Sequence, residues 1–242
     1  MVKNLVVALL FAPIAVFAAG DEIRLDDANI DSNDAISIQR GARTFVNYCL
    51  NCHSATAMRY NRLTDLGLTE QQIKDNLLLT SDKVGDPMTI SARRKDQKQW
   101  FGVEPPDLSV IARSRGTDWL YTYLRTFYRD NTRPTGWNNL AFPNVGMPHA
   151  LWQLQGMQVL KTQSEEHDGH KVEHKQLALE TPGTLSPLEY DRVTRDLVNY
   201  LSYMAEPAKA RRSQIGILVL FFLVLLLVPA WLLKKEYWKD VH

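Results

Sequence analysis

Cysteine is scarce in this sequence, and neither sign of charge is in surplus. The 242 residues include two cysteines, and the formal net charge at pH 7 is +1. A structural zinc site of the finger type needs further Cys or His ligands at regular spacing, which the surroundings of the cysteine pair do not supply. The basic residues are scattered rather than gathered in one block, which indicates a solvated surface and gives no reason to expect a nucleic acid as partner.

Both cysteines fall in one motif, Cys49-Leu50-Asn51-Cys52-His53. The spacing C-x-x-C-H is the attachment motif of c-type haem. Two cysteines three positions apart on one helical turn point the same way, so both thiols reach the vinyl groups of one haem, and His53 is held where its imidazole reaches the iron. A thioredoxin-like dithiol needs a strand before the motif and a helix after it, whereas a helical pattern runs into this one. The motif predicts one covalently attached haem c, bound through Cys49, Cys52 and His53.

Apolar runs occupy both ends of the chain. Residues 1–18 carry an early positive charge, an apolar run and then small residues, which predicts a secretory signal peptide rather than a membrane span. The stretch from Ile215 to Leu233 is apolar for nineteen residues without a charge, which is long enough to cross a bilayer. A buried core helix is the alternative, but few soluble domains bury a helix that is apolar on every face.

The chain therefore divides into a signal peptide (1–18), an exported haem domain (19–212), a transmembrane anchor helix (213–234) and a short cytoplasmic tail (235–242). Basic residues flank the anchor on both sides, so charge alone does not orient it. The signal peptide does, because it exports everything up to the span. Roughly 190 residues between the two membrane segments suit one domain with one core.

Helix signals frame the haem domain. Asp34 predicts the start of a helix that runs from about residue 35 into the haem motif, with Gly41 and Phe45 four residues apart. Ser186-Pro187-Leu188-Glu189 predicts a capping box that opens a helix to about residue 205. The pair resembles class I cytochromes c, in which an N-terminal helix with a glycine and an aromatic crosses a C-terminal helix.

The middle of the chain gives weaker signals. Thr69 and Thr117 predict N-caps of two further helices, ending near residues 78 and 128. The polar, basic segment 87–102 is typical of a surface loop. Asp168-Gly169 predicts the turn of a small β-hairpin between about residues 157 and 179.

That hairpin carries three histidines. His167, His170 and His174 stand among acidic residues, and these ligand types suit a metal site. A solvated polar tip is the simpler interpretation.

The second axial ligand of the iron decides the class of function. A haem with one protein ligand keeps an open face for gases or peroxide, whereas a haem bound by His and Met is closed and passes electrons. Met147 lies in a glycine- and proline-braced loop (142–148), with enough chain between it and His53 to wrap round the ring. We expect iron ligation by His53 and Met147, with His149 as the main rival and Met88 as a further possibility.

Together these features resemble the cytochrome c1 family, the membrane-anchored haem subunits of the cytochrome bc1 complex (ubiquinol–cytochrome c reductase). The haem motif alone is shared by c-type cytochromes in general, and three further segments make the resemblance specific. They are Pro105-Pro106-Asp107-Leu108-Ser109 with Ile111-Ala112-Arg113-Ser114-Arg115 after it, Gly146-Met147-Pro148, and Ala205-Glu206-Pro207 ahead of the anchor helix. The hairpin region is longer and the N-terminal half shorter than expected for mitochondrial members, which indicates a bacterial form.

The resemblance implies a mostly α, class I cytochrome c-like domain with a small β-hairpin insertion and one C-terminal transmembrane helix. It places the domain on the periplasmic side of the bacterial inner membrane, in a complex with cytochrome b and the Rieske iron–sulfur protein. One electron arrives from the Rieske protein and leaves to a soluble cytochrome c or similar carrier. Quinol chemistry belongs to cytochrome b, so the subunit is expected to have no independent catalysis.

The resemblance also implies roles for two further residues. In the family an arginine after the P-P-D-L-S segment pairs with a haem propionate; by position it is Arg115, with Arg113 as the alternative. A backbone carbonyl of Pro106 or Pro105 is a candidate acceptor for the other ring N–H of His53.

Two rival functions stay open on the sequence. A membrane-anchored cytochrome c that donates to a terminal oxidase shares the ligands and the anchor, but has no reason to carry the P-P-D-L-S segment. A haem peroxidase or gas sensor needs an open iron face.

Overall fold

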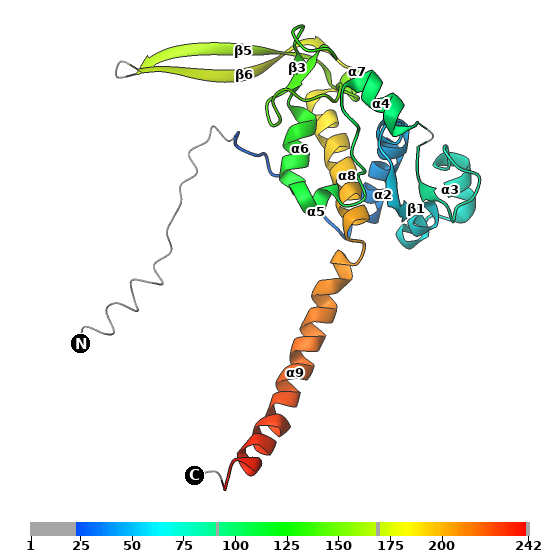
Figure 1. Cartoon of the computed structure of the whole chain (residues 1–242), viewed down its shortest axis with the longest axis vertical. Helices are drawn as coiled ribbons and strands as arrows, with labels where there is room; N and C mark the ends of the chain where they lie inside the picture. Colours follow the sequence, from blue (N-terminus) through cyan, green and yellow to red (C-terminus); the bar gives the residue numbers. More distant parts are fainter. Residues whose placement is uncertain (1–22, 91, 168–169, 241–242) are drawn as a thin grey trace.

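The computed structural model describes residues 23–90, 92–167 and 170–240, with side chains described at all of these except 163–174, 210 and 213. Figure 1 shows a mainly helical domain from which a β-hairpin and a long C-terminal helix project in different directions. In chain order the elements are α2 (Ala35–Thr44), the π-helix η1 (Phe45–Cys49), β1 (Ala55–Arg59), the 3-10 helix η2 (Tyr60–Leu66), α3 (Glu70–Asn76), β2 (Pro87–Met88), α4 (Arg94–Phe101), α5 (Ile111–Arg115), α6 (Thr117–Arg125), β3 (Phe127–Arg129), β4 (Trp137–Asn139), α7 (Trp152–Gln155), β5 (Gly156–His167), β6 (His170–Pro182), α8 (Pro187–Ala205) and α9 (Lys209–Tyr237). The mostly α class is confirmed, and the predicted signal peptide (1–18) lies outside the described residues.

Three helices begin at the caps that the sequence predicts. Asp34 accepts a hydrogen bond of 2.9 Å from the backbone N–H of Ser37 at the start of α2. Ser186 and Glu189 form a capping box at the start of α8, and Thr69 opens α3 with another. Each cap satisfies backbone donors that the first turn of a helix leaves without partners.

Helices α2 and α8 cross in close contact, as predicted. A Cβ atom on Gly41 would lie 2.0 Å from the carbonyl oxygen of Asp196, so only glycine allows this approach. One turn further on, the rings of Phe45 and Tyr200 pack with centroids 5.3 Å apart. One face of α8 is buried with its side chains Leu197, Tyr200, Leu201 and Met204.

Helix α6 differs from its prediction at both ends. It begins at Thr117, and its N-cap position is Gly116, whose φ of +87° favours glycine, so Thr117 is not the cap. It ends at Arg125 rather than near residue 128, because the chain passes into strand β3, which pairs antiparallel with β4. Pairing with a strand that arrives later in the chain overrides the local helical pattern.

Segment 87–102 is not the surface loop that its polarity predicts. Strand β2 pairs with β1, and Met88 within it is fully buried. Residues Arg94–Phe101 form α4, and Gln97 on that helix is 3 % exposed. The charged side chains of the segment stay outside, while these two side chains enter the interior.

The predicted hairpin is present and is longer than expected. Strands β5 and β6 have 12 and 13 residues and pair antiparallel from Gly156↔Pro182 to His167↔His170. Gln158 anchors its base, because its side-chain amide donates to the carbonyl oxygens of Arg125 and Phe127 at 2.9 Å. The predicted turn at 168–169 lies outside the described residues.

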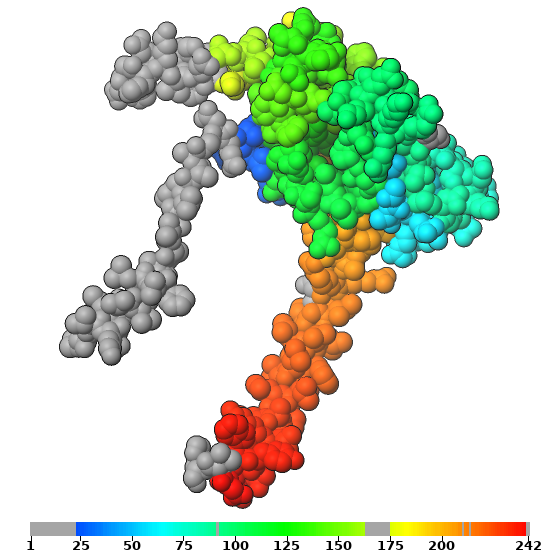
Figure 2. All heavy atoms as spheres, viewed as in Figure 1, coloured from blue at the N-terminus to red at the C-terminus, as the bar shows by residue number. Residues whose placement is uncertain are grey.

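Helix α9 is apolar over most of its length and stands clear of the domain (Figure 2). Its segment Gln214–Tyr237 has 24 residues. The most apolar 18-residue window of that segment has a mean hydropathy of 2.9, and none of the window is buried in the protein. By length and composition it is suited to cross a membrane. The helix continues on both sides of the predicted anchor (213–234), whose bounds in a membrane stay a prediction.

We expect Gly41→Ala to destabilise the domain strongly, because the added methyl group forces α2 and α8 apart. Overpacking at so tight a contact costs about 3 kcal/mol of unfolding free energy, measurable by urea denaturation of the detergent-solubilised protein. The matched control is Gly85→Ala, where an added Cβ meets nothing within 4 Å. Equal stability of the two variants would contradict the close crossing.

Candidate haem-binding site

The predicted attachment motif winds around one carbonyl oxygen. Helix α2 runs into a wide π-turn, closed by a hydrogen bond of 3.0 Å from the Leu50 N–H to the Phe45 carbonyl. The backbone N–H groups of Cys52 and His53 then both donate to the carbonyl oxygen of Cys49, at 3.0 and 2.9 Å. The two cysteines and the histidine are thereby brought together by the backbone itself.

The surroundings of the cysteines argue against a thiol redox site. A helix precedes the motif and strand β1 follows it, which is the reverse of the thioredoxin order. Both thiols are free. Burial raises the pKa of the Cys49 thiol to about 12 and also raises that of Cys52, so neither is a stabilised thiolate.

His53 is buried with one ring nitrogen committed to the backbone. Its Nδ1 lies 2.7 Å from the carbonyl oxygen of Pro106, so Nδ1 carries the proton and donates. This tautomer leaves the Nε2 lone pair for a metal. Burial lowers the pKa of His53, which favours the neutral ring that a metal requires. The contact is with Pro106 rather than Pro105; its role in haem binding stays a prediction.

The P-P-D-L-S segment is tied directly to the residues that follow the motif. Four hydrogen bonds join them. The Leu108 N–H donates to the Ser54 carbonyl (2.9 Å), and the Ala57 N–H donates to the Ser109 hydroxyl (3.0 Å). The backbone N–H and the hydroxyl of Thr56 both donate to the Asp107 carboxylate at 2.9 Å. Partial burial raises the pKa of Asp107, but hydrogen bonds from Ser109 and Thr56 outweigh it and hold the pKa below its ordinary value. The resulting clamp fixes Pro106 against His53.

Gln97 is a site residue that the sequence analysis missed. Its side-chain amide donates to the carbonyl oxygen of Cys52 at 2.7 Å, within the motif itself. The residue belongs to α4, in the segment that was predicted to be a loop. A single amide among charged residues carries no sequence signal for such a contact.

Met147 lies half-buried in its loop and has a hydrogen-bond donor on its sulfur. The hydroxyl of Tyr123 donates to Sδ of Met147 at 3.2 Å. A thioether sulfur has two lone pairs, so one remains for a metal. Burial raises the pKa of Tyr123 well above its ordinary value, so its hydroxyl keeps its proton.

The two rival ligands occupy more enclosed positions. Met88 is fully buried, and its sulfur accepts a hydrogen bond of 3.2 Å from the Tyr200 hydroxyl. The ring of His149 is 2 % exposed, stacks on Phe127 at 4.8 Å and meets Trp137 edge-on at 5.2 Å. Burial lowers the pKa of His149 to about 4. Its Nε2 is buried without a hydrogen-bond partner among the described residues.

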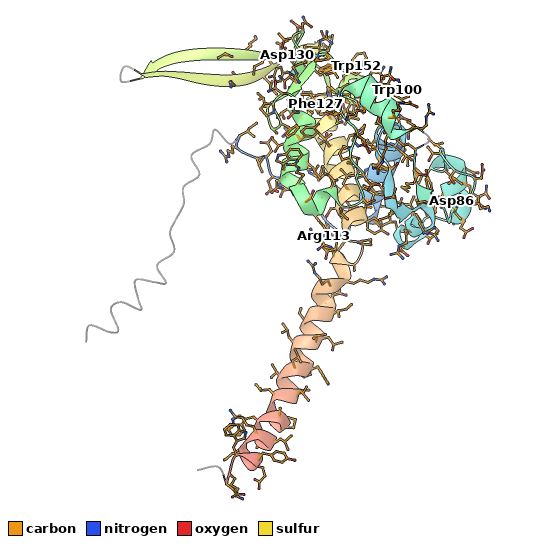
Figure 3. All side chains as sticks on the ribbon, in the orientation of Figure 1. Asp86, Trp100, Arg113, Phe127, Asp130 and Trp152 are labelled. Carbon is orange, nitrogen blue, oxygen red and sulfur yellow. The ribbon has the colours of Figure 1, made fainter. Side chains whose placement is uncertain are left out.

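The two candidate arginines lie in different surroundings. Arg115 is exposed, and its guanidinium lies over the rings of Trp119 and Phe142, 5.1 and 5.8 Å from their centroids. Trp119 in turn stacks on Tyr123 at 4.9 Å, so Arg115 belongs to the wall that contacts Met147. Arg113 lies at the opposite end of the domain from Phe127, near the start of α9 (Figure 3).

The donor set fits haem c. Two free thiols, an imidazole with Nδ1 already bonded and a thioether with a free lone pair are what attachment and two axial bonds require. For the hairpin histidines 167, 170 and 174, the side chains lie outside the described part of the structure. In the described part, no group of three or more His, Cys, Asp or Glu residues is arranged to hold a metal ion.

Comparison with known proteins identifies the family of the chain. The model of the cytochrome C1 family matches residues 26–241, which include the motif, the clamp and the anchor helix. The chain belongs to the cytochrome c1 family.

Relatives match over nearly the whole length. Cytochrome c1 of Allochromatium vinosum is 50 % identical over 235 residues, which cover 97 % of this chain and 96 % of the relative. A protein of Nitrosomonas europaea named ammonia monooxygenase gamma subunit is 51 % identical over 242 residues, covering 100 % and 99 %. The mitochondrial cytochrome c1, heme protein, of Saccharomyces cerevisiae is 25 % identical over 237 residues, covering 86 % and 68 %.

We expect Asp107→Asn to loosen the clamp and to flatten its acid dependence. Because the folded pKa of Asp107 is lowered, its stabilising contribution is present above the ordinary carboxyl pKa and is lost as pH falls through the folded value. The variant should lose about 1 kcal/mol at pH 7, since the carboxylate is largely exposed, and nothing near pH 2. Urea denaturation between pH 2 and pH 7 measures the unfolding free energy of the variant and of the unsubstituted protein, and Asp82→Asn at an exposed position is the control. If the two free energies differ by the same amount at every pH, the lowered pKa of Asp107 does not contribute to stability.

Proposed function

We propose that this chain is the haem-bearing electron-transfer subunit of a cytochrome bc1 complex. The observation that carries the proposal is the family match over residues 26–241, which spans the C-x-x-C-H turn, the clamp around Pro106 and the anchor helix. The subunit takes one electron from the Rieske iron–sulfur protein and passes it to a soluble cytochrome c or similar carrier. Cytochrome b carries out the quinol chemistry, so this chain is not a separate catalyst.

The cofactor is one haem c, attached to Cys49 and Cys52. When bound, it supplies an iron that accepts and releases a single electron. The chain's own part is to bind and orient: His53, with its ring fixed by Pro106, and Met147 would hold the iron. With two ligands supplied by the protein, the iron would have no coordination site for substrates or gases, and no residue is needed to move a proton.

Arg115 is proposed to neutralise a haem propionate. Its guanidinium is exposed and held over two aromatic rings, which restricts its position without using its N–H donors. A charge-assisted bond from such a preorganised fork offsets part of the cost of enclosing a carboxylate.

In the membrane, α9 is proposed to be the single anchor, with the haem domain (19–212) on the periplasmic side, the anchor at 213–234 and a cytoplasmic tail at 235–242. The signal peptide (1–18) sets the direction in which the anchor helix crosses the membrane, because it exports the chain up to that helix. Lipid is therefore a partner along the whole apolar helix.

Two other assignments share these features. A donor to a terminal oxidase is one, and the name of the Nitrosomonas europaea relative suggests a subunit of an ammonia monooxygenase as the other. The three possibilities differ in the proteins that accompany the chain, so isolation of the complex separates them.

Affinity isolation of the tagged chain from detergent-solubilised membranes should recover cytochrome b and a Rieske iron–sulfur protein together with it. Untagged membranes are the control, and mass spectrometry identifies the partners. Recovery of oxidase or monooxygenase subunits without cytochrome b would refute the proposal.

Met147→Leu should open the iron to carbon monoxide and lower its midpoint potential, because a thioether stabilises the reduced iron. The midpoint potential should fall by at least about 59 mV, which corresponds to a tenfold change in the redox equilibrium constant of a one-electron couple. Spectroelectrochemical titration with and without carbon monoxide measures both. Met157→Leu, at the half-buried base of the hairpin, is the matched control; an unchanged spectrum for Met147→Leu would assign the ligand elsewhere.

A further inference from the structure

Tyr123 is packed between two other aromatic rings. It lies on α6 with Trp119 one turn before it on the same helix, and Phe127 belongs to strand β3, which follows the helix. The Trp119 ring stacks on it at 4.9 Å and 10°, and the Phe127 ring meets it edge-on at 5.0 Å. A ring packed in this way has little freedom to move its hydroxyl.

One amide ties the helix that carries Tyr123 to the loop that follows. The side chain of Asn139 is fully buried; it donates to the Tyr123 carbonyl oxygen at 2.7 Å and accepts from the backbone N–H groups of Ala141 and Phe142 at 2.9 and 3.0 Å. The Met147 loop therefore starts from a point fixed on α6. This explains how the hydroxyl of Tyr123 and Sδ of Met147 come to lie 3.2 Å apart.

A hydrogen bond to a ligand sulfur acts on the iron through that sulfur. The O–H group withdraws electron density from the thioether and points the positive end of its dipole toward the metal. Both effects disfavour the ferric state more than the ferrous state, because ferric iron carries the greater charge. In a buried, weakly screened site the effect of one such bond is larger than it would be in water.

We infer that Tyr123 is a positioning residue that raises the reduction potential of the haem iron by donating a hydrogen bond to Met147. The inference deepens the proposed function and rests on it, since it requires Met147 to be the axial ligand. The structure also holds a second pair of the same kind, Tyr200 and Met88, with the same 3.2 Å separation. That pair provides the matched control.

The test is Tyr123→Phe in the full-length, haem-loaded protein in detergent. The ring and its packing are kept, and only the O–H···S bond is lost. The midpoint potential should fall by about 30 mV, which corresponds to an about threefold change in the redox equilibrium constant of a one-electron couple. The iron should remain six-coordinate and should not bind carbon monoxide. This result would show that the potential changed while Met147 stayed bound to the iron.

Tyr200→Phe removes the corresponding bond to Met88 and should leave the potential unchanged. If Tyr200→Phe shifts the potential and Tyr123→Phe does not, Met88 is the ligand, and both this inference and the ligand set of the proposed function are overturned. If Met147→Leu changes the potential and Tyr123→Phe leaves it unchanged, the ligand set stands and this inference alone is overturned. Carbon monoxide binding by Tyr123→Phe also overturns it, because the tyrosine would then hold the loop rather than tune the sulfur.

A second substitution decides the matter if Tyr123→Phe fails to take up haem. Incorporation of 3-fluorotyrosine at position 123 keeps the ring and the hydroxyl and makes the hydroxyl a stronger donor. The potential should then rise, which is the opposite direction to Tyr123→Phe. A potential equal to that of the unsubstituted protein overturns the inference.

Discussion

The close approach of α2 to α8 at Gly41 is the contact on which the site depends. With 2.0 Å between an imagined Cβ and the Asp196 carbonyl oxygen, a larger residue would separate the helices. Helix α2 continues directly into the π-turn that presents Cys49, so any shift at the crossing is passed along a rigid element to the attachment motif. Close-packed interiors transmit such shifts rather than absorb them.

His53 and Met147 are held in place by different kinds of contact. The clamp around Asp107 and the Gln97 amide bind the backbone that surrounds His53, while Met147 is held from the other side by α6 and its tyrosine. One proposed iron ligand is thus fixed mainly by backbone hydrogen bonds and the other by aromatic packing. The first arrangement orients a ring nitrogen, and the second places a hydroxyl donor on a sulfur atom.

What could be predicted from the sequence was local. The caps at Asp34, Thr69 and Ser186 follow from residue types within one turn, and the haem motif and the anchor helix are continuous segments. The crossing at Gly41 was predicted from the resemblance to class I cytochromes c, in which a glycine and an aromatic residue mark the N-terminal helix. The contact of His53 with a proline carbonyl was predicted from the hydrogen-bond partner that a metal-binding histidine usually has, with Pro105 and Pro106 as alternatives in the segment that the resemblance singles out.

What could not be predicted depends on contacts distant in the chain. Met88 and Gln97 lie among charged residues, and only pairing with β1 and contact with Cys52 bring them inside. The end of α6 at Arg125 is set by strand β4, which begins twelve residues later at Trp137. The hydrogen bond between Tyr123 and Met147 joins a helix to a loop, and no periodic pattern in the sequence predicts such a contact.

The short link between α8 and α9 limits where electrons can be delivered. Only residues 206–208 separate the two helices, and the backbone N–H of Glu206 and of Lys209 are both used in hydrogen bonds across this link. Even fully stretched, three residues reach about 11 Å. With α9 in a bilayer, a link of this length would keep the haem domain close to the membrane surface. Electron donors and acceptors would then have to approach the domain at that surface.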